Sequence, residues 1–138
     1  MEPILVKTEE IREWSNEFRL IQPEAVRSMT QSMQSTGQLQ PLILLKNDDG
    51  YHIIDGIKRY RSALELGLGE LQSLVFEVDM VMAKAMILHY NRHSSSLSMY
   101  EQGLIVRRLV HDHGMSQREV GRVLRQSHSW VCRRLSLI

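Results

Sequence analysis

The chain has 138 residues, and its 17 lysines and arginines against 16 aspartates and glutamates give a formal net charge of +1. Apolar residues make up 43% and charged residues 24%, which is ordinary for a globular protein, so we expect a buried core. No apolar run approaches the ~20 residues of a membrane span, and a single cysteine, Cys132, excludes an internal disulfide. With no signal-peptide pattern either, we expect a cytoplasmic protein.

Strand and helix signals alternate over the first ninety residues. We expect strands at 3–7, 41–46, 51–55 and 71–79, with a hairpin turn at "NDDG". We expect helices at 21–37, 56–66 and 80–91, because Pro23 suits a first helical turn and because Gly37 and Gly67 are good terminators. This order predicts a small α/β domain over residues 1–92.

Only helix signals follow the serine-rich stretch "HSSSLS" at residues 93–98. Ser98 with Glu101, and Ser116 with Glu119, have the spacing of capping boxes at the starts of two helices. A third helix is expected to start near Ser127 or Ser129. The predicted fold class is therefore α+β, with an all-helical domain over residues 97–138.

The charge is concentrated in this helical part. Residues 101–138 have seven arginines against three carboxylates, a net charge of +4, whereas residues 1–100 have a net charge of −3. A basic C-terminal part is typical of nucleic-acid binding, although a solvated basic face accounts for the charge alone equally well.

The last two expected helices are joined by about four residues, which is the spacing of a helix-turn-helix motif. Phosphate contacts are expected from the arginines 118, 122, 125 and 134, and Gln117 could hold a phosphate or orient the reading helix. The residues expected at base edges are Ser127, His128, Ser129, Trp130 and Arg133, of which Arg133 best matches guanine. The full predicted DNA-binding set is Gln117, Arg118, Arg122, Ser127, His128, Ser129, Trp130, Arg133 and Arg134. The turn often contains glycine, but here the position is Arg125, and a plain helical domain remains the alternative.

A second cationic cluster lies where the strand at 51–55 leads into a helix, in "IIDGIKRYRSALELGLG" (53–69). Lys58, Arg59 and Arg61 fall in the first turns of that helix, where the helix dipole disfavours cations unless an anion joins them. A triphosphate would satisfy both the amides and the cations. The alternative is an Asp55–Arg pair with two solvated cations. The P-loop pattern GxxxxGK[ST] is absent.

The stretch "TGQLQPLILLKNDDGYHIIDGIKRYRSALELGLGEL" resembles the N-terminal domain of ParB partition proteins, with their "G-x-x-Q-P" and "GERR-x-R-A" motifs. The following "NRHSSSLSMYEQGLIVRRLVHDHGMSQREVGRVLRQSHSWVCRRLSLI" resembles that family's "EN-x-Q-R-x-x-L-x-x-x-E" and helix-turn-helix. The resemblance implies a domain that binds CTP with Mg2+ and a reader of a centromere-like DNA site. The implied nucleotide-binding residues are Arg19, Gly37, Gln40, Pro41, Gly56, Lys58, Arg59, Arg61 and Asn91, and Asn91 is also the implied metal ligand.

Three positions depart from the family motifs. Ile57 replaces the glutamate of "GERR", Tyr90 replaces the glutamate of "EN", and Ser94 replaces the arginine of "Q-R". Because a hard oxygen ligand and a phosphate fork are lost, we predict weakened or altered CTP binding and slow or absent hydrolysis, at most a weak CTPase.

The resemblance further implies a homodimer, a ParA-type ATPase partner and a place on a nucleoid or plasmid, in partition or in regulation of a mobile element. The family usually has a C-terminal dimerisation domain, so the chain is expected to be a fragment or a shortened relative. Two alternatives remain: a phosphotransferase, because "DGIKR" is similar to the "DGHHR" motif of a ParB-related free-serine kinase, and a DNA-binding regulator without nucleotide. A nuclease is disfavoured, because no dense carboxylate set is present.

Overall fold

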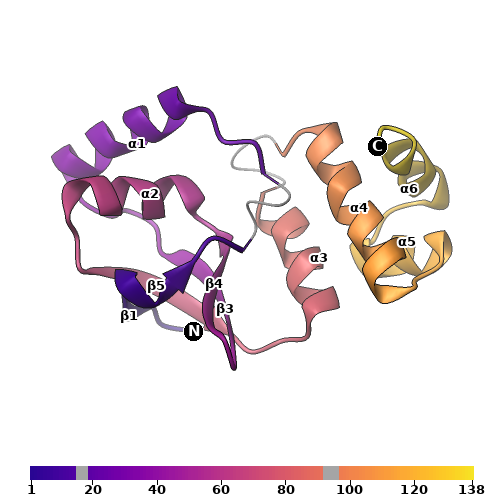
Figure 1. Ribbon diagram of the computed structural model, residues 1–138, viewed down its shortest axis with the longest axis horizontal. Helices are drawn as coiled ribbons and strands as arrows, with labels where there is room; N and C mark the ends of the chain where they lie inside the picture. The colour runs from indigo at the N-terminus through magenta and orange to yellow at the C-terminus, as the bar shows by residue number, and fades with distance from the viewer. Residues whose placement is uncertain (15–18, 92–96) are drawn as a thin grey trace. The chain divides into compact units, whose positions relative to one another are not determined.

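The computed structural model describes residues 1–14, 19–91 and 97–138, which form two compact units (Figure 1). The α/β unit contains residues 1–14 and 20–78. The helical unit contains Arg19 together with residues 79–91 and 97–138.

A mixed sheet forms the centre of the α/β unit. Its strands are β1 (Ile4–Lys7), β2 (Ile11–Arg12), β3 (Leu42–Asn47), β4 (Gly50–Asp55) and β5 (Glu70–Phe76), in the order β1-β5-β3-β4-β2 within the described residues. β3 pairs with β4 in the antiparallel direction and with β5 in the parallel direction, so it is the central strand. A short 3-10 helix, η1 (Thr8–Glu10), connects β1 to β2.

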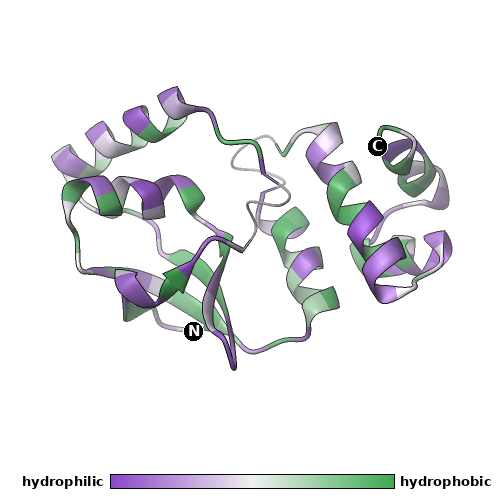
Figure 2. Ribbon diagram, viewed as in Figure 1, coloured by the Kyte–Doolittle hydropathy of each residue, from purple (hydrophilic) through white to green (hydrophobic). Residues whose placement is uncertain are grey.

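Two helices, α1 (Pro23–Thr36) and α2 (Ile57–Leu66), pack against each other beside this sheet. The core between sheet and helices contains Leu42, Leu44 and Ile53 from the strands, with Met33 of α1 and Ala63 of α2. Figure 2 shows the hydrophobic colour of much of these strands, and hydrophilic and hydrophobic residues alternating along both helices. Gly67 ends α2 in the left-handed conformation, with φ +70°.

The helical unit consists of α3 (Met80–Tyr90), α4 (Met99–His113), α5 (Gln117–Leu124) and α6 (His128–Leu135). α4 and α5 begin with the predicted capping boxes, in which Ser98 pairs with Glu101 and Ser116 with Glu119. Leu109 of α4, Val120 of α5 and Val131 of α6 are fully buried, so the three helices share one core.

α3 is apolar around most of its circumference (Figure 2). Its one lysine, Lys84, is buried, and its Nζ lies 2.7 Å from Nε2 of His113 near the end of α4. This contact and the apolar side chains tie α3 to α4. Within the described parts of the chain, no helix is both long enough and apolar enough to span a bilayer.

The predicted α+β fold class is confirmed, and the predicted helices are present within two residues of their expected ends. The prediction for 71–79 was too long, because β5 ends at Phe76 and Asp79 caps α3 by accepting a hydrogen bond from Met82 N. η1 and β2 were not predicted. α3 belongs to the helical unit by compactness, whereas the boundary predicted between residues 92 and 97 falls mostly outside the described residues and stays a prediction.

Candidate functional site

The start of α2 has the local geometry of a phosphate-binding helix terminus. Gly56 precedes the helix with φ +114° and ψ 24°, and no side chain caps the amides of the first turn. The amides of the first turn have no intrahelical acceptors and point out of the helix end, together with the positive end of its dipole. A Cβ at Gly56 would lie 2.4 Å from Cδ2 of Leu42, so both the backbone conformation and the packing require glycine.

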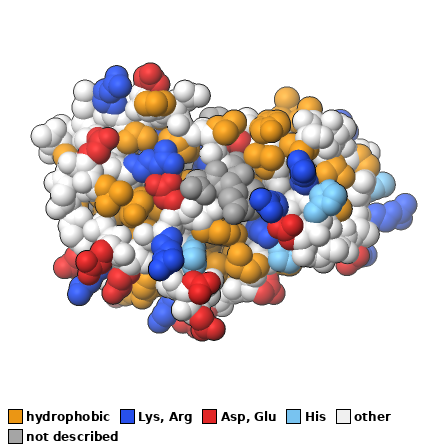
Figure 3. Space-filling model, viewed as in Figure 1, with side chains coloured by type: hydrophobic (Ala, Val, Ile, Leu, Met, Phe, Trp, Pro, Cys, Tyr) orange, Lys and Arg blue, Asp and Glu red, His pale blue; other side chains and the backbone are white. Residues whose placement is uncertain are grey.

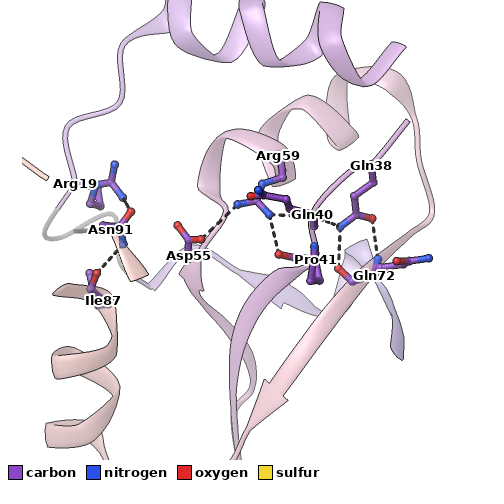
Figure 4. Close-up of polar contacts among 9 residues, drawn as sticks. All are labelled: Arg19, Gln38, Gln40, Pro41, Asp55, Arg59, Gln72, Ile87 and Asn91. Carbon is purple, nitrogen blue, oxygen red and sulfur yellow. Dashed lines mark hydrogen bonds and ion pairs between the residues drawn. The ribbon is translucent and has the colours of Figure 1, made fainter. Parts of the chain in front are cut away.

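Arg59, predicted to bind phosphate, is engaged within the α/β unit (Figure 4). Its Nη1 donates to the backbone oxygens of Gln40, at 3.0 Å, and Pro41, at 2.7 Å. Its Nη2 lies 3.3 Å from Oδ2 of Asp55, and 12% of the Arg59 side chain is exposed. The structure therefore contains the Asp55–Arg pair named as the alternative, and Arg59 ties the loop before β3 to α2.

Arg61 is also paired, because its Nε and Nη2 donate to the two carboxylate oxygens of Glu13 at 2.9 and 2.7 Å. This bidentate contact raises the pKa of Arg61 above its ordinary value. Burial raises the pKa of the neighbouring Tyr60 phenol, and the Glu13 charge adds to that effect. Lys58 is the remaining cation, and its half-buried side chain makes no hydrogen bond or ion pair with the described residues.

The loop from Gly37 to Pro41 is held against the sheet by Gln38, which was not predicted as a site residue. Its Nε2 donates to the backbone oxygens of Gln40 and Gln72, and its Oε1 accepts from Gln72 N at 2.8 Å. Gly37 has φ +74° and begins this loop after α1. The predicted residues Gly37, Gln40, Pro41, Gly56, Lys58 and Arg59 thus lie in one region of the α/β unit.

Arg19 and Asn91 lie in the helical unit and contact each other (Figure 4). The guanidinium of Arg19 donates to Oδ1 of Asn91 and, at 3.3 Å, to Oε2 of Glu101. Glu101 also accepts the amide of Ser98 in the capping box, and Asn91 donates to the backbone oxygen of Ile87. All three side chains are nearly buried, so this network links the end of α3 to the start of α4.

This arrangement does not fit a Mg2+ ion on Asn91, because Oδ1 already accepts from a cation. The described residues contain no group of three or more His, Cys, Asp or Glu side chains that could hold a metal ion. Ser94, at the missing arginine of "Q-R", lies outside the described residues.

α4, α5 and α6 form the expected helix-turn-helix arrangement. Ser127 caps α6 by accepting a hydrogen bond from Trp130 N, and Gly121 lets the α5–α6 turn pack closely, because a Cβ there would lie 2.8 Å from the oxygen of Gln126. Gly103 plays the same part where α4 meets α6, with a Cβ position 2.6 Å from the oxygen of Arg134. Sequence reasoning did not single out these two glycines, since nothing local marks a helix-to-helix approach.

A cationic hollow of about 510 Å3 lies between α5 and the start of α6. It is lined by Arg118, Gly121, Arg122, Arg125, Gln126 and His128. Figure 3 shows Lys, Arg and His side chains on the visible face of the helical unit, with acidic side chains beside some of them. Arginines gathered on an exposed surface repel one another and favour a polyanion.

The predicted DNA-binding residues divide into two groups. Arg134 is occupied, because its Nε donates to Gln102 at 2.7 Å and its guanidinium stacks 4.6 Å from the centre of the Trp130 ring. Gln117 accepts a hydrogen bond from the thiol of Cys132 at 2.8 Å, so a residue of α6 orients the side-chain amide of Gln117. The side chains of the predicted set that remain exposed are Arg118, Arg122, His128, Ser129, Arg133 and the cap residue Ser127.

The family comparison identifies this architecture. The family model described as the ParB N-terminal domain matches residues 2–92. The chain belongs to the ParB family. The match runs from β1 through α3, so it includes the α2 terminus and the Arg19–Asn91 contact.

Relatives and solved structures extend the similarity beyond the ParB N-terminal domain. The chain is 30% identical over 115 residues to the chromosome-partitioning protein ParB of Myxococcus xanthus, covering 83% of this chain and 39% of the relative. It therefore spans about two fifths of the length of that protein. A crystal structure of C-terminally truncated ParB from Caulobacter crescentus complexed with CTP-γ-S has a TM-score of 0.62 at 20% identity, covering 98% of this chain and 77% of the other. The same protein complexed to the centromeric parS site has a TM-score of 0.61 at 20% identity, covering 96% and 70%.

Proposed function

We propose that the chain is the nucleotide- and DNA-binding part of a ParB-type partition protein. Residues 97–138 bind a centromere-like duplex, and residues 1–92 form a nucleotide-binding-type domain. The observation that carries the proposal is the cationic hollow on a well-capped helix-turn-helix in a ParB family member. The parS complex of the Caulobacter relative supports the choice of ligand.

The exposed side chains suggest how DNA would be held. Arg118 and Arg122 on α5 contact phosphates, and they supply affinity without sequence choice. His128, Ser129 and Arg133 on α6 reach base edges, with Arg133 on guanine. Ser127 caps α6, and Trp130 stacks on Arg134 within that helix. Gln117 bonds to Cys132 of α6. These four residues support the DNA-contacting side chains and lie beside them in the proposed interface.

The α/β domain binds the triphosphate of CTP at the start of α2. The first-turn amides next to Gly56 and the side chain of Lys58 hold the phosphates, since Arg59 and Arg61 already have carboxylate or carbonyl partners. Arg59, Gln40 and Pro41 shape the loop around this terminus. The CTP-γ-S complex of the Caulobacter relative supports this nucleotide.

We expect binding to be weak and to gain little from Mg2+, because Asn91 and Arg19 satisfy each other. Hydrolysis is slow or absent. As in the family, the protein acts as a homodimer on a nucleoid or plasmid, with a ParA-type ATPase as partner. Two copies would double the DNA contacts and fix the half-site spacing.

Selection of bound duplexes from a random pool, with and without CTP, tests the DNA part of the proposal. Enrichment of one inverted-repeat site over the starting pool supports the proposal, and the absence of any enriched sequence refutes it. Calorimetric titration of CTP, with and without Mg2+, tests the nucleotide part. Lys58→Ala should remove the heat of binding, whereas Lys46→Ala, an exposed lysine at the end of β3, serves as the charge-matched control.

A DNA-binding regulator that uses no nucleotide is the second candidate. The pairing of Arg59 with Asp55 and of Arg61 with Glu13 favours it, because two of the three cations are neutralised within the fold. Site selection that is indifferent to CTP, together with no heat of CTP binding, would identify this case.

A further inference from the structure

The turn between α5 and α6 has a backbone conformation that disfavours its side chain. Arg125 has φ 56° and ψ 45°, and it is the non-glycine residue with positive φ among the described residues. The left-handed residues that end α2 and α4 are Gly67 and Gly114. Glycine takes this conformation without a Cβ clash, so an arginine here is strained.

The surrounding backbone fixes this conformation whatever the side chain. The amide of Arg125 donates to the oxygen of Arg122 at 3.3 Å, and that of Gln126 donates to the oxygen of Gly121 at 2.8 Å. These bonds close the last turn of α5 and direct the chain into α6. A Cβ at Gly121 would lie 2.8 Å from the backbone oxygen of Gln126, so the turn packs directly against α5.

The side chain of Arg125 is exposed, and it does not offset the strain through a hydrogen bond or an ion pair with the described residues. It lines the cationic hollow with Arg118 and Arg122, and like charges on the lining of one hollow repel one another. The end of α5 favours a cation through the helix dipole, but a neighbouring lysine or arginine in the last turn would gain the same without strain.

We propose that Arg125 is kept at this glycine position because its guanidinium contacts the phosphate backbone of bound duplex DNA, at a cost in the stability of the free protein. The proposal rests on the proposed DNA-binding function. It assigns Arg125 a place beside Arg118 and Arg122 in one phosphate-binding surface. It also predicts that stability and DNA affinity respond in opposite directions to the same substitution.

Arg125→Gln and Arg125→Gly separate charge from strain. Both variants should bind the selected duplex roughly three- to tenfold more weakly, and the slope of log K against log salt should fall by about 1 per protomer. Arg125→Gly should also raise the melting temperature by about 2–5 °C, whereas Arg125→Gln, which keeps the strained backbone and the Cβ, should leave it within about 1 °C. Fluorescence anisotropy at several salt concentrations and thermal denaturation give the two readouts.

Gly114→Arg is the matched control, because Gly114 ends α4 with φ 62° and a Cβ there meets nothing within 4 Å. It should lower the melting temperature by a similar amount and leave the salt slope undiminished. The double variant Arg125→Gly, Gly114→Arg keeps the net charge and should still bind DNA weakly.

Wild-type affinity and salt slope in Arg125→Gln would overturn the phosphate contact, and an unchanged melting temperature in Arg125→Gly would overturn the stability cost. Both results presuppose a wild-type protein that binds DNA. If the wild-type chain binds no duplex, the proposed function itself fails, and Arg125 falls with it.

Discussion

Gly56→Ala should destabilise the protein more than a glycine-to-alanine change at any other glycine that flanks a described helix. Two terms add at this position. A residue with a side chain costs about 1–3 kcal/mol of backbone strain at φ +114°. The new Cβ would also lie 2.4 Å from Cδ2 of Leu42, a fully buried residue of β3, and such overpacking costs about 1–3 kcal/mol. We therefore expect the free energy of unfolding to fall by about 2–6 kcal/mol.

Gly67→Ala isolates the strain term, because Gly67 has φ +70° and a Cβ there meets nothing within 4 Å. It should cost about 1–2 kcal/mol. Urea denaturation followed by circular dichroism gives both free energies. If Gly56→Ala is no more destabilising than Gly67→Ala, the contact with Leu42 is not rigid and the reasoning is refuted. Leu42→Ala removes the atom that clashes but leaves a cavity in the core, so the double variant Gly56→Ala, Leu42→Ala should be less destabilised than the sum of the two single variants.

Arg19→Met should lower the free energy of unfolding by about 1–3 kcal/mol, because it removes the ion pair and hydrogen bond that Arg19 makes with the buried Glu101 carboxylate. Glu2→Gln, at an exposed side-chain carboxylate near the N-terminus, is the control, and a change below about 0.5 kcal/mol for Arg19→Met would contradict the network. Burial lowers the pKa of His52 below its ordinary value of 6.5, so its contribution to stability is present above pH 6.5 and is lost as the pH falls through the folded value; urea midpoints between pH 7.5 and 5.5 should decline less in His52→Gln than in the wild type, and parallel declines would exclude His52 as the cause. Arg133→Ala should relax base preference in the duplex selection, whereas Arg122→Ala should weaken all duplexes alike and reduce the salt slope by about 1, so equal behaviour would refute the division of roles.

Local signals in the sequence predicted most of the fold. Both capping boxes, the hairpin turn and the glycine at the end of α2 involve residues within five positions of each other, and each is present. β2 has only two residues, and it exists because Ile11 and Arg12 pair with β4, forty residues further along the chain. Such an element leaves no periodic pattern.

The site was predicted less completely, because its partners are distant in sequence. The cluster around Gly56 was visible as cations at a helix start, but Glu13, the partner of Arg61, lies 48 residues away. Glu101 was identified as a capping residue, whereas its ion pair with Arg19 spans 82 residues. Ion pairs between residues so far apart are visible only in the folded chain. The sequence-based prediction therefore assigned more unpaired cations to the phosphate site than the structure contains.

The Arg19–Asn91–Glu101 contact makes the helical unit discontinuous along the chain. A fragment that starts at Asp79 would contain the described helices α3 to α6 and yet lack Arg19, which forms an ion pair with the buried Glu101. We therefore expect α4, α5 and α6 to lose stability when they replace the corresponding helices of a relative, unless the hybrid protein also has an arginine at position 19, which precedes most of the α/β unit in the sequence.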